Sequence, residues 1–284
     1  MSPSSRTSVL LLCPVFNEEQ HLDSLITSLK QQTWSDWILV FGDNVSNDGT
    51  SQKIKNASML DSRIRAFHYG EHLTVHDSFN RTFQDALDKI RSKYVQIIGA
   101  DDCFASNSSL QQLVSAISRE SGGFVAGNMI HVTEKGKLER NDFRFFDPPS
   151  QRTIRRFALD KWGANLMYSL FERNEFESLI SHPIARFSSN LASDWWFSWV
   201  ALNSVKNPVL IDTVTYKKFR KLEGFSSPPP KSRAKVVLAV FRQCLTRIGD
   251  RRPYLGLIRS TALFFWLTIA EIWLLRKFIV RKAN

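Results

Sequence analysis

Short apolar runs alternate with amphipathic segments along the first hundred residues of the chain. The apolar runs are nearly continuous, as expected for strands that are buried on both faces of a sheet. In the segments between them, apolar side chains recur at helical intervals. The pattern predicts strands over 9–13, 37–41, 64–69 and 94–98 and helices over 18–32, 51–60 and 78–90. Because strands and helices alternate, we expect parallel βαβ units and an α/β fold with a mostly parallel central sheet.

The pattern changes after residue 102. It predicts helices over 110–117, 166–180 and 193–202, strands over 124–132 and 208–216, a turn at 135–137 and an irregular stretch over 141–165. Three consecutive prolines at 228–230 then make a stiff break, beyond which the composition shifts. We therefore expect one globular domain over 1–227, with halves at about 8–102 and 103–227, and a helical appendage over 231–284.

Two polar clusters stand where predicted strands end. Asp43 and Asn44 follow one strand, and Asp101 and Asp102 follow another. In an open α/β sheet, ligands bind in the crevice beyond the carboxyl ends of the strands. An unpaired carboxylate is costly to bury, so something in that crevice must compensate these charges. A hard divalent cation that carries a ligand phosphate fits such oxygen donors best.

The basic charge of the chain is concentrated at its carboxyl end. The 284 residues include 38 Lys and Arg against 27 Asp and Glu, a net charge of +11. Residues 231–284 hold 12 basic and 2 acidic residues, a balance of +10, which leaves +1 on residues 1–230. An enzyme that acts on nucleic acid is expected to carry a basic face near its active site, so we expect no nucleic-acid partner.

Cysteine usage and the amino terminus both favour the cytoplasm. The three cysteines, Cys13, Cys103 and Cys244, are widely spread and lack metal-ligand spacing, which suits a reducing compartment. The first eight residues are polar, and the apolar run 9–13 is too short for the core of a signal peptide. None of the six histidines has a ligand spacing that assigns it a role.

Three segments, in order and at matching separations, resemble glycosyltransferase family 2, whose members have the GT-A fold. They are Pro14 to Glu18 (PVFNE), Ser28 to Thr33 (SLKQQT) and Asp43 to Thr50 (DNVSNDGT). The resemblance covers roughly residues 8–226. It implies the inverting transfer of a sugar from a nucleotide-sugar donor, with a lean to UDP, to a hydroxyl acceptor.

The resemblance also implies a set of residues that contact the donor nucleotide. They are Pro14, Phe16, Asn17, Glu18, Asp43, Asn44, Asn80 and Asp101. Asp43 and Asn44 can pair with the edge of a base, Phe16 offers an apolar ledge, and Asn80 is expected to brace the nucleotide loop. The alternative is that the Asn, Asp and Gly residues of the third segment simply form a turn.

The resemblance assigns Asp101 and Asp102 as ligands of Mg²⁺ or Mn²⁺ on the donor diphosphate, where the metal would neutralise charge on the leaving group. Many relatives have a further Asp two positions before Asp101, and here that position is Gly99. The alternative for Asp102 is that it caps the next helix or pairs with a lysine.

Inversion requires a base that removes the proton of the attacking hydroxyl. In the family this carboxylate starts a helix in the second half of the domain, and Asp194 is the matching residue. The alternative is a helix N-cap, with the two tryptophans that follow packed in the core.

The segment 216–226, which is rich in basic residues, resembles a family stretch in which an Arg is followed two residues later by a His. The position of that His is Leu222, so Lys218 or Arg220 is left to meet phosphate. A solvated basic strand end is the alternative.

The appendage carries an apolar run over 260–275. A helix of this length rises about 24 Å, which is short of the roughly 30 Å hydrocarbon core. Its flanking arginines and internal tryptophans favour a helix that lies in the membrane interface, and 236–248 is a second, amphipathic candidate. We expect peripheral attachment to the inner face of a membrane, with docking on a partner protein or a single span as alternatives.

The sequence therefore predicts a metal-assisted glycosyltransferase that acts on a glycan or lipid-linked acceptor at a membrane surface, in polysaccharide or lipid-linked glycan assembly. One alternative is a non-catalytic membrane-associated binding protein of the same fold, which Gly99 and Leu222 favour. Another is a nucleotidyltransferase, although the segment after the first strand lacks the glycine-rich phosphate loop that this class needs.

Overall fold

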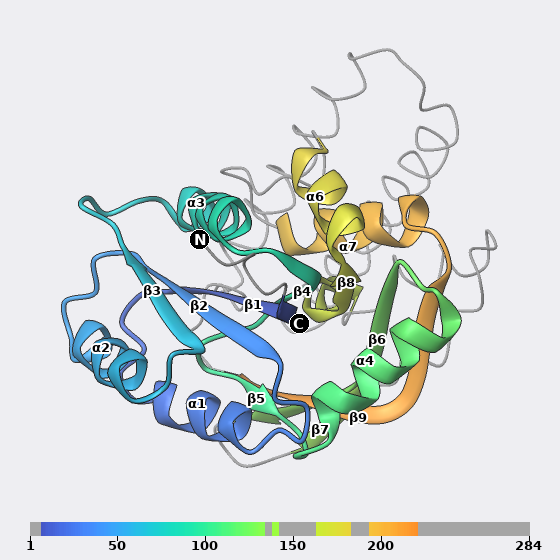
Figure 1. Ribbon diagram of the computed structural model, residues 1–284, viewed down its shortest axis with the longest axis horizontal. Coiled ribbons are helices and arrows are strands. Elements are labelled where there is room, and N and C mark those ends of the chain that lie inside the picture. Colours follow the sequence, from blue (N-terminus) through green and yellow to red (C-terminus); the bar gives the residue numbers. More distant parts are fainter. Residues whose placement is uncertain (1–6, 134–137, 142–162, 183–192, 221–284) are drawn as a thin grey trace, which may run out of the picture.

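The computed structural model of the protein describes residues 7–133, 138–141, 163–182 and 193–220 (Figure 1). The predicted turn at 135–137, nearly all of the stretch over 141–165, the prolines at 228–230 and the whole appendage over 231–284 lie outside these residues. The domain boundary placed at 227 and the membrane-associated tail therefore stay predictions.

The strands within the described ranges form one mixed sheet, in the order β3-β2-β1-β4-β8-β6-β9-β5, with β7 paired to β6. The strands are β1 (Thr7–Val15), β2 (Trp37–Asp43), β3 (Ile64–His68), β4 (Ser92–Ile97), β5 (Cys103–Phe104), β6 (Phe124–Thr133), β7 (Leu138–Asn141), β8 (Leu170–Glu172) and β9 (Pro208–Arg220). The predicted α/β class and the parallel βαβ units of the first hundred residues are confirmed.

Helices pack on both faces of the parallel part of the sheet. In Figure 1, α1 and α2 lie on one side of β1, β2 and β3, and α3 lies on the other. The helices are α1 (Leu22–Lys30), α2 (Thr50–Leu60), α3 (Val75–Lys89), α4 (Ser109–Glu120), the 3-10 helix η1 (Gly163–Tyr168), α6 (Arg173–Ser181) and α7 (Ser193–Ser204). Gly42 lets α3 approach β2, since a Cβ there would lie 1.8 Å from Thr82 Oγ1.

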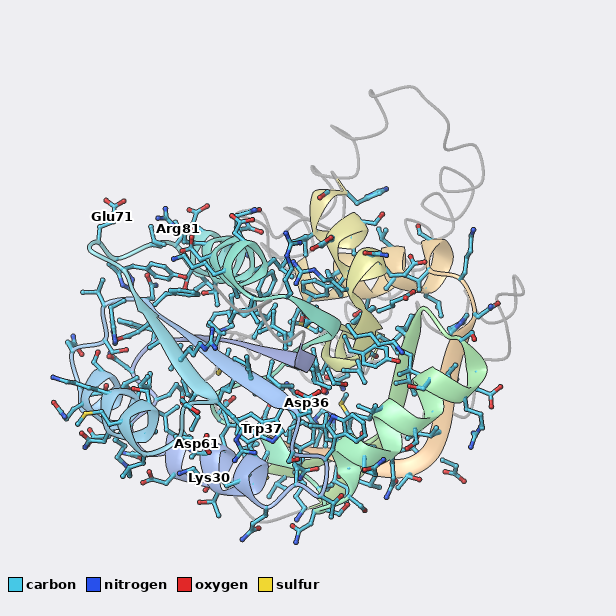
Figure 2. All side chains as sticks on the ribbon, in the orientation of Figure 1. Lys30, Asp36, Trp37, Asp61, Glu71 and Arg81 are labelled. Carbon is cyan, nitrogen blue, oxygen red and sulfur yellow. The ribbon has the colours of Figure 1, made fainter. Side chains whose placement is uncertain are left out.

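The strand directions bring the functional segments to one side of the molecule. β2 and β4 are parallel to β1, and β8 is antiparallel to both β4 and β6. β6 and its parallel partner β9 therefore run in the same sense as β4. In Figure 2, Asp36 and Trp37 mark the start of β2, and Glu71, in the loop after β3, lies at the opposite, carboxyl end of the sheet. The ends of β1, β2, β4 and β9 share that carboxyl end.

The helix predicted over 166–180 is wrong in its first part. The structure has the end of η1, then the strand β8, and only then α6. β8 fills the space between β4 and β6, where Leu170 pairs with Gln96 and Phe171 pairs with Phe124. A strand of three residues is too short to show a period of two in the sequence, and the same holds for β5, which the pattern also missed.

An aromatic cluster joins β8 to the elements around it. The ring of Phe171 lies 5.3 Å from that of Phe124, 6.0 Å from that of Phe176 and 5.6 Å from that of Phe197. All four side chains are fully buried. Rings at these separations add about 0.5–1.5 kcal/mol per pair to the burial of apolar area. The cluster therefore fixes α6 and α7 against the sheet.

Arg173 joins α6 to the end of α3. Its guanidinium donates from Nη1 to the carbonyl of Ile90 at 2.6 Å and from Nη2 to the carbonyl of Leu87 at 2.7 Å. Nε donates to Glu177 at 2.7 Å. The last carbonyl groups of a helix have no partner within the helix, so this buried side chain supplies two of the missing donors.

We expect Arg173→Met to lower the free energy of unfolding by about 2–4 kcal/mol, because it strands two buried carbonyls and removes a buried charge from its partners. Arg81→Met is the matched control. Arg81 projects from α3 into solvent (Figure 2), and its ion pair with Asp85 is exposed, so its loss should change the stability far less. Urea denaturation of both variants measures the difference, and equal effects would contradict this account of Arg173.

Candidate functional site

The loop after β1 is locked to the loop after β2 through Asn17. Asn17 takes a left-handed backbone conformation with φ of 54°. Its backbone N–H donates to Ser46 Oγ at 3.0 Å, and its side-chain oxygen accepts from the N–H of Asn47 at 2.9 Å. Asn tolerates this conformation better than most residues. Asn17 therefore shapes the loop on which a ligand would lie.

A second set of bonds links the same loops. The backbone N–H of Glu18 donates to Thr50 Oγ1 at 2.8 Å, and the Glu19 carboxylate accepts from the N–H of Gly49 at 3.0 Å. A Cβ at Gly49 would lie 2.3 Å from that carboxylate. Asp48 accepts from the N–H groups of Glu19 and Thr50. The turn interpretation thus describes Asp48 and Gly49 well.

Asp43 is a buried carboxylate with several donors around it. Ser46 donates to it from N at 3.1 Å and from Oγ at 2.6 Å, Ser51 donates from Oγ, and His68 Nδ1 lies 3.3 Å away. Burial alone would raise the pKa of Asp43, but the hydrogen bonds from Ser46, Ser51 and His68 hold it below its usual value. The group stays ionised, and a base that pairs with it must displace one of these donors.

Asn44 is also held by the protein. Its amide donates to the carbonyl of Leu73 at 2.9 Å and accepts from the N–H of Leu73 at 2.8 Å. Asn80, on α3, lines a cavity of about 450 Å³ together with Leu73 and Ile180. Leu73 therefore binds Asn44 and shares the lining of one cavity with Asn80.

An aromatic ledge lies over the same loop. Phe16 is 41% exposed, and its ring lies 4.6 Å from that of His72. His72 Nδ1 lies 3.0 Å from the carbonyl oxygen of Asn44. Pro14 is half-buried and stands opposite Gly42 in the sheet. His68 and His72 were given no role by the sequence because their closeness to Asp43 and Phe16 depends on the fold alone.

The second acidic cluster splits into two unlike carboxylates. Asp101 is half-buried, whereas Asp102 is only 1% exposed. Asp102 Oδ2 lies 3.2 Å from Lys218 Nζ, and Oδ1 accepts from the backbone N–H of Phe219 at 3.1 Å. Pairing of Asp102 with a lysine, one alternative from the sequence, is what the structure shows.

Burial and pairing act against each other in this ion pair. Burial raises the pKa of Asp102 to about 6, although Lys218 opposes the rise. Burial works to lower the pKa of Lys218, but Asp102, Tyr168 and Asp101 together more than offset it, so that pKa is raised. The ammonium therefore keeps its charge across the physiological range, and Asp102 is mostly ionised at neutral pH.

There is a steric reason for the glycine at position 99. A Cβ at this position would lie 2.5 Å from Asp102 Oδ2 and 3.0 Å from Asp101 Oδ1. The N–H of Gly99 donates to the hydroxyl oxygen of Tyr216 at 2.9 Å. The space that a side chain at position 99 would need is thus filled by Asp102 in its pairing position.

Asp194 lies in the first turn of α7, and α7 packs against η1, the helix that ends at Tyr168. Burial is the main reason that the pKa of Tyr168 is raised, Lys218 opposes the rise, and the charges of Asp102 and Asp194 add to it. Lys218 Nζ lies 3.6 Å from the centroid of the Tyr168 ring. The charges of Asp102 and Asp194, which come from distant parts of the sequence, therefore act on the same tyrosine.

The segment Ser28 to Thr33 is hydrogen-bonded to the chain that follows the acidic cluster. Gln32, which is buried, donates to the carbonyls of Ser28 and Ser106 and accepts from the N–H of Leu110 at 2.9 Å. The N–H of Thr33 donates to the carbonyl of Asn107 at 2.8 Å. These bonds hold the segment 106–110, which follows the acidic cluster in the chain.

A metal would need ligands besides those that the described residues provide. Among them, no group of three or more His, Cys, Asp or Glu side chains is placed to hold an ion. Both oxygens of Asp102 are used by Lys218 and Phe219. Asp101 fits an ion that is carried mainly by the phosphates of a ligand, which is how Mg²⁺ is commonly bound. The side chain of Arg220 and all of Leu222 lie outside the described residues.

Within the ranges that the structure describes, no helix is long and apolar enough to cross a membrane. The segment 260–275, on which the membrane prediction depends, lies outside them.

The sequence matches known glycosyltransferases. The family model described as "Glycosyl transferase family 2" matches residues 11–176. The chain is 22% identical over 132 residues to a Bacillus subtilis protein assigned as a teichuronic acid biosynthesis glycosyltransferase, TuaG, and covers 51% of it. It is 22% identical over 198 residues to the GalNAc(5)-diNAcBac-PP-undecaprenol beta-1,3-glucosyltransferase of Campylobacter jejuni, and covers 60% of it. These matches take in 46% and 69% of this chain, so it spans little more than half the length of either relative.

Solved structures share the fold. S. aureus TarS 1-349 in complex with UDP-GlcNAc superposes with a TM-score of 0.68 at 14% identity, over 91% of this chain and 71% of that chain. The mannosyltransferase PcManGT from Pyrobaculum calidifontis, in complex with GDP-Man and Mn²⁺, superposes with a TM-score of 0.55 at 14% identity, over 92% of this chain and 71% of that chain. At this identity the likeness shows the fold alone, and it confirms the GT-A architecture.

We expect Gly99→Ala to lower the free energy of unfolding by about 1–3 kcal/mol, because the added methyl group forces Asp102 away from Lys218. Gly70→Ala is the control: nothing lies within 4 Å of a Cβ at Gly70, and the change should stay within about 0.5 kcal/mol. Denaturant titration of both variants gives the comparison. A Gly99→Ala protein as stable as wild type would show that the cluster has room for a side chain.

Proposed function

The chain belongs to glycosyltransferase family 2, and on that premise we propose that it moves a sugar from a nucleotide-sugar donor, UDP-linked, to a hydroxyl acceptor with inversion. One observation carries the proposal more than any other. Asp102 pairs with Lys218 beside Tyr168, next in the chain to Asp101, and α7, with Asp194 in its first turn, packs against the helix η1 that ends at Tyr168. The carboxyl end of the strands, where this cluster lies, is where open α/β sheets bind ligands.

The donor would lie across the two interlocked loops. Its base would rest on the Phe16–His72 ledge, with its edge against Asp43. There the base would replace one of the groups that now donate to the Asp43 carboxylate. His68 is the exposed donor, with 52% of its side chain accessible, and is the one most easily displaced. The TarS structure was determined with UDP-GlcNAc, which supports a uridine donor.

The reaction would be a single displacement. Asp194 takes the proton of the acceptor hydroxyl, whose oxygen forms a bond to the anomeric carbon of the sugar. The bond from that carbon to the diphosphate oxygen breaks, and the nucleoside diphosphate leaves with the electron pair. Asp194 is half-buried, and after burial, the main cause, its charge adds to the rise in the pKa of Tyr168, which supports its assignment to this site.

Mg²⁺ or Mn²⁺ fits this site, and Asp101 would hold it together with the donor diphosphate. When bound, it neutralises charge on the leaving group. Asp102, the next residue, would not hold the ion in the same way, because both of its own oxygens are bound by β9. The Mn²⁺ in the structure of PcManGT supports the use of a divalent ion.

The acceptor is proposed to be a glycan or a lipid-linked glycan at a membrane surface, in polysaccharide or lipid-linked glycan assembly. The printed name of the Campylobacter relative describes an undecaprenol-linked acceptor. The basic, apolar segment 231–284 is proposed to hold the protein at the inner face of the membrane.

Calorimetric titration of UDP, GDP and CDP, with and without Mn²⁺, tests the donor site. We expect one nucleotide to bind, Mn²⁺ to strengthen its binding, and Asp101→Ala to remove that gain, because an ion on the diphosphate then loses its carboxylate. Asp36→Ala, an exposed Asp at the opposite end of the sheet (Figure 2), should leave both affinities unchanged. No binding of any nucleotide in either condition would overturn the proposed function.

Asp194→Asn tests the base. The amide keeps the shape of the side chain but cannot accept the proton, so we expect sugar transfer to fall by about 10²-fold or more. Affinity for the nucleotide should stay within about twofold of wild type, since the base acts on the acceptor. Release of nucleoside diphosphate from the donor, with a membrane extract as acceptor source, measures turnover. Full activity of this variant would remove Asp194 from the mechanism.

A further inference from the structure

Lys218 lies at the place where the proposed donor would put its diphosphate. β9 runs in the same sense as β4, so its last residues reach the carboxyl end of the sheet beside the acidic cluster. Lys218 Nζ contacts Asp102, and the charge of Asp101 also acts on it. Its side chain is 18% exposed, so it is not sealed within the core.

Three residues fit together to hold this ammonium. Gly99 leaves room for the Asp102 carboxylate, which would otherwise collide with a Cβ at 2.5 Å. Asp102 accepts from Lys218 at 3.2 Å, and the Tyr168 ring packs against the ammonium at 3.6 Å. Tyr168 in turn stacks on Tyr216 at 5.7 Å, and the Tyr216 hydroxyl oxygen accepts from the N–H of Gly99. Together these contacts hold the ammonium of Lys218 in one position, which a flexible lysine on the surface would not do.

We propose, on the basis of the proposed function, that Lys218 is a fixed cation of the donor site that meets the diphosphate and makes nucleotide binding depend less on a divalent ion. Position 99 has no carboxylate, and the space this leaves lets Asp102 bind Lys218. In place of a carboxylate at position 99, which would attract a metal ion, the site therefore has the positive charge of Lys218.

The charge balance of the cluster sets the direction of the effect. Asp101 and Asp102 carry two negative charges, and Lys218 reduces their sum to one. With the lysine in place, the cluster repels a diphosphate less and attracts a divalent ion less. Without it, two carboxylates face the diphosphate, and only a bound cation offsets the repulsion.

The test compares nucleotide affinity in EDTA and in Mn²⁺, using UDP with GDP and CDP titrated in parallel. For wild type we expect Mn²⁺ to improve the dissociation constant by less than about tenfold. Lys218→Met should weaken binding in EDTA much more than in Mn²⁺, so that the gain from Mn²⁺ grows by at least about tenfold. Lys218→Arg should keep the ratio close to that of wild type, because it retains the charge.

Lys217→Met is the matched control. Lys217 is the neighbouring lysine of β9, and its side chain lies on the other face of the strand. It should change neither affinity, and thermal denaturation of every variant checks the fold.

The outcomes separate the two proposals. A gain from Mn²⁺ that is the same in wild type and in folded Lys218→Met would overturn the role of Lys218 and leave the donor site intact. Binding by wild type only when Mn²⁺ is present would also overturn it. No nucleotide binding by wild type in either condition would overturn the proposed function, and this inference with it.

Discussion

The ion pair between Asp102 and Lys218 is the contact on which the arrangement of the site depends. It joins the segment after β4, in the first half of the domain, to the end of β9, in the second half, 116 residues away in sequence. The N–H of Phe219 adds a second bond to the same carboxylate. An ion pair that is buried this deeply is a poor source of stability, since desolvation offsets most of its attraction. It is better understood as a contact that fixes the Asp102 carboxylate on the end of β9, so that both of its oxygens are engaged within the protein.

The nucleotide side of the crevice is organised by a different physical constraint, the need of buried polar groups for partners. Asp43 and Asn44 stand at the end of a buried strand, where neither water nor a core can satisfy them. Serine hydroxyls and backbone groups do so, and in return the two side chains hold the loop in one conformation. A pre-formed loop lowers the cost of ordering when a ligand binds. The residues that the family resemblance assigns to the ligand thus act first on the protein.

Most of the fold was predictable from the sequence, and the site only in part. The strand predicted over 9–13 is recognised by its continuous apolar run, and the helix predicted over 78–90 by apolar residues at helical intervals. β8 did not, because three residues carry no period and its place between β4 and β6 depends on tertiary pairing. The motifs singled out Asp101 and Asp194, whose roles stay predictions, but that Asp102 and not Asp101 pairs with Lys218 follows only from the structure. The contact of Lys218 with Asp102, that of His68 with Asp43 and that of His72 with Phe16 join residues far apart in the sequence, so only the structure shows them.

The two departures from the family pattern have unequal explanations. Position 99 is explained by the structure, because a side chain there and the observed Asp102 exclude each other. Returning an aspartate to position 99 would therefore not rebuild a fuller metal site by itself. It would expel Asp102, strand Lys218 beside Tyr168 without its carboxylate, and place a new negative charge next to Asp101. Charge and space at the end of β4 are coupled to the end of β9, so an acidic ligand at 99 and a paired lysine at 218 are alternative solutions for the same site.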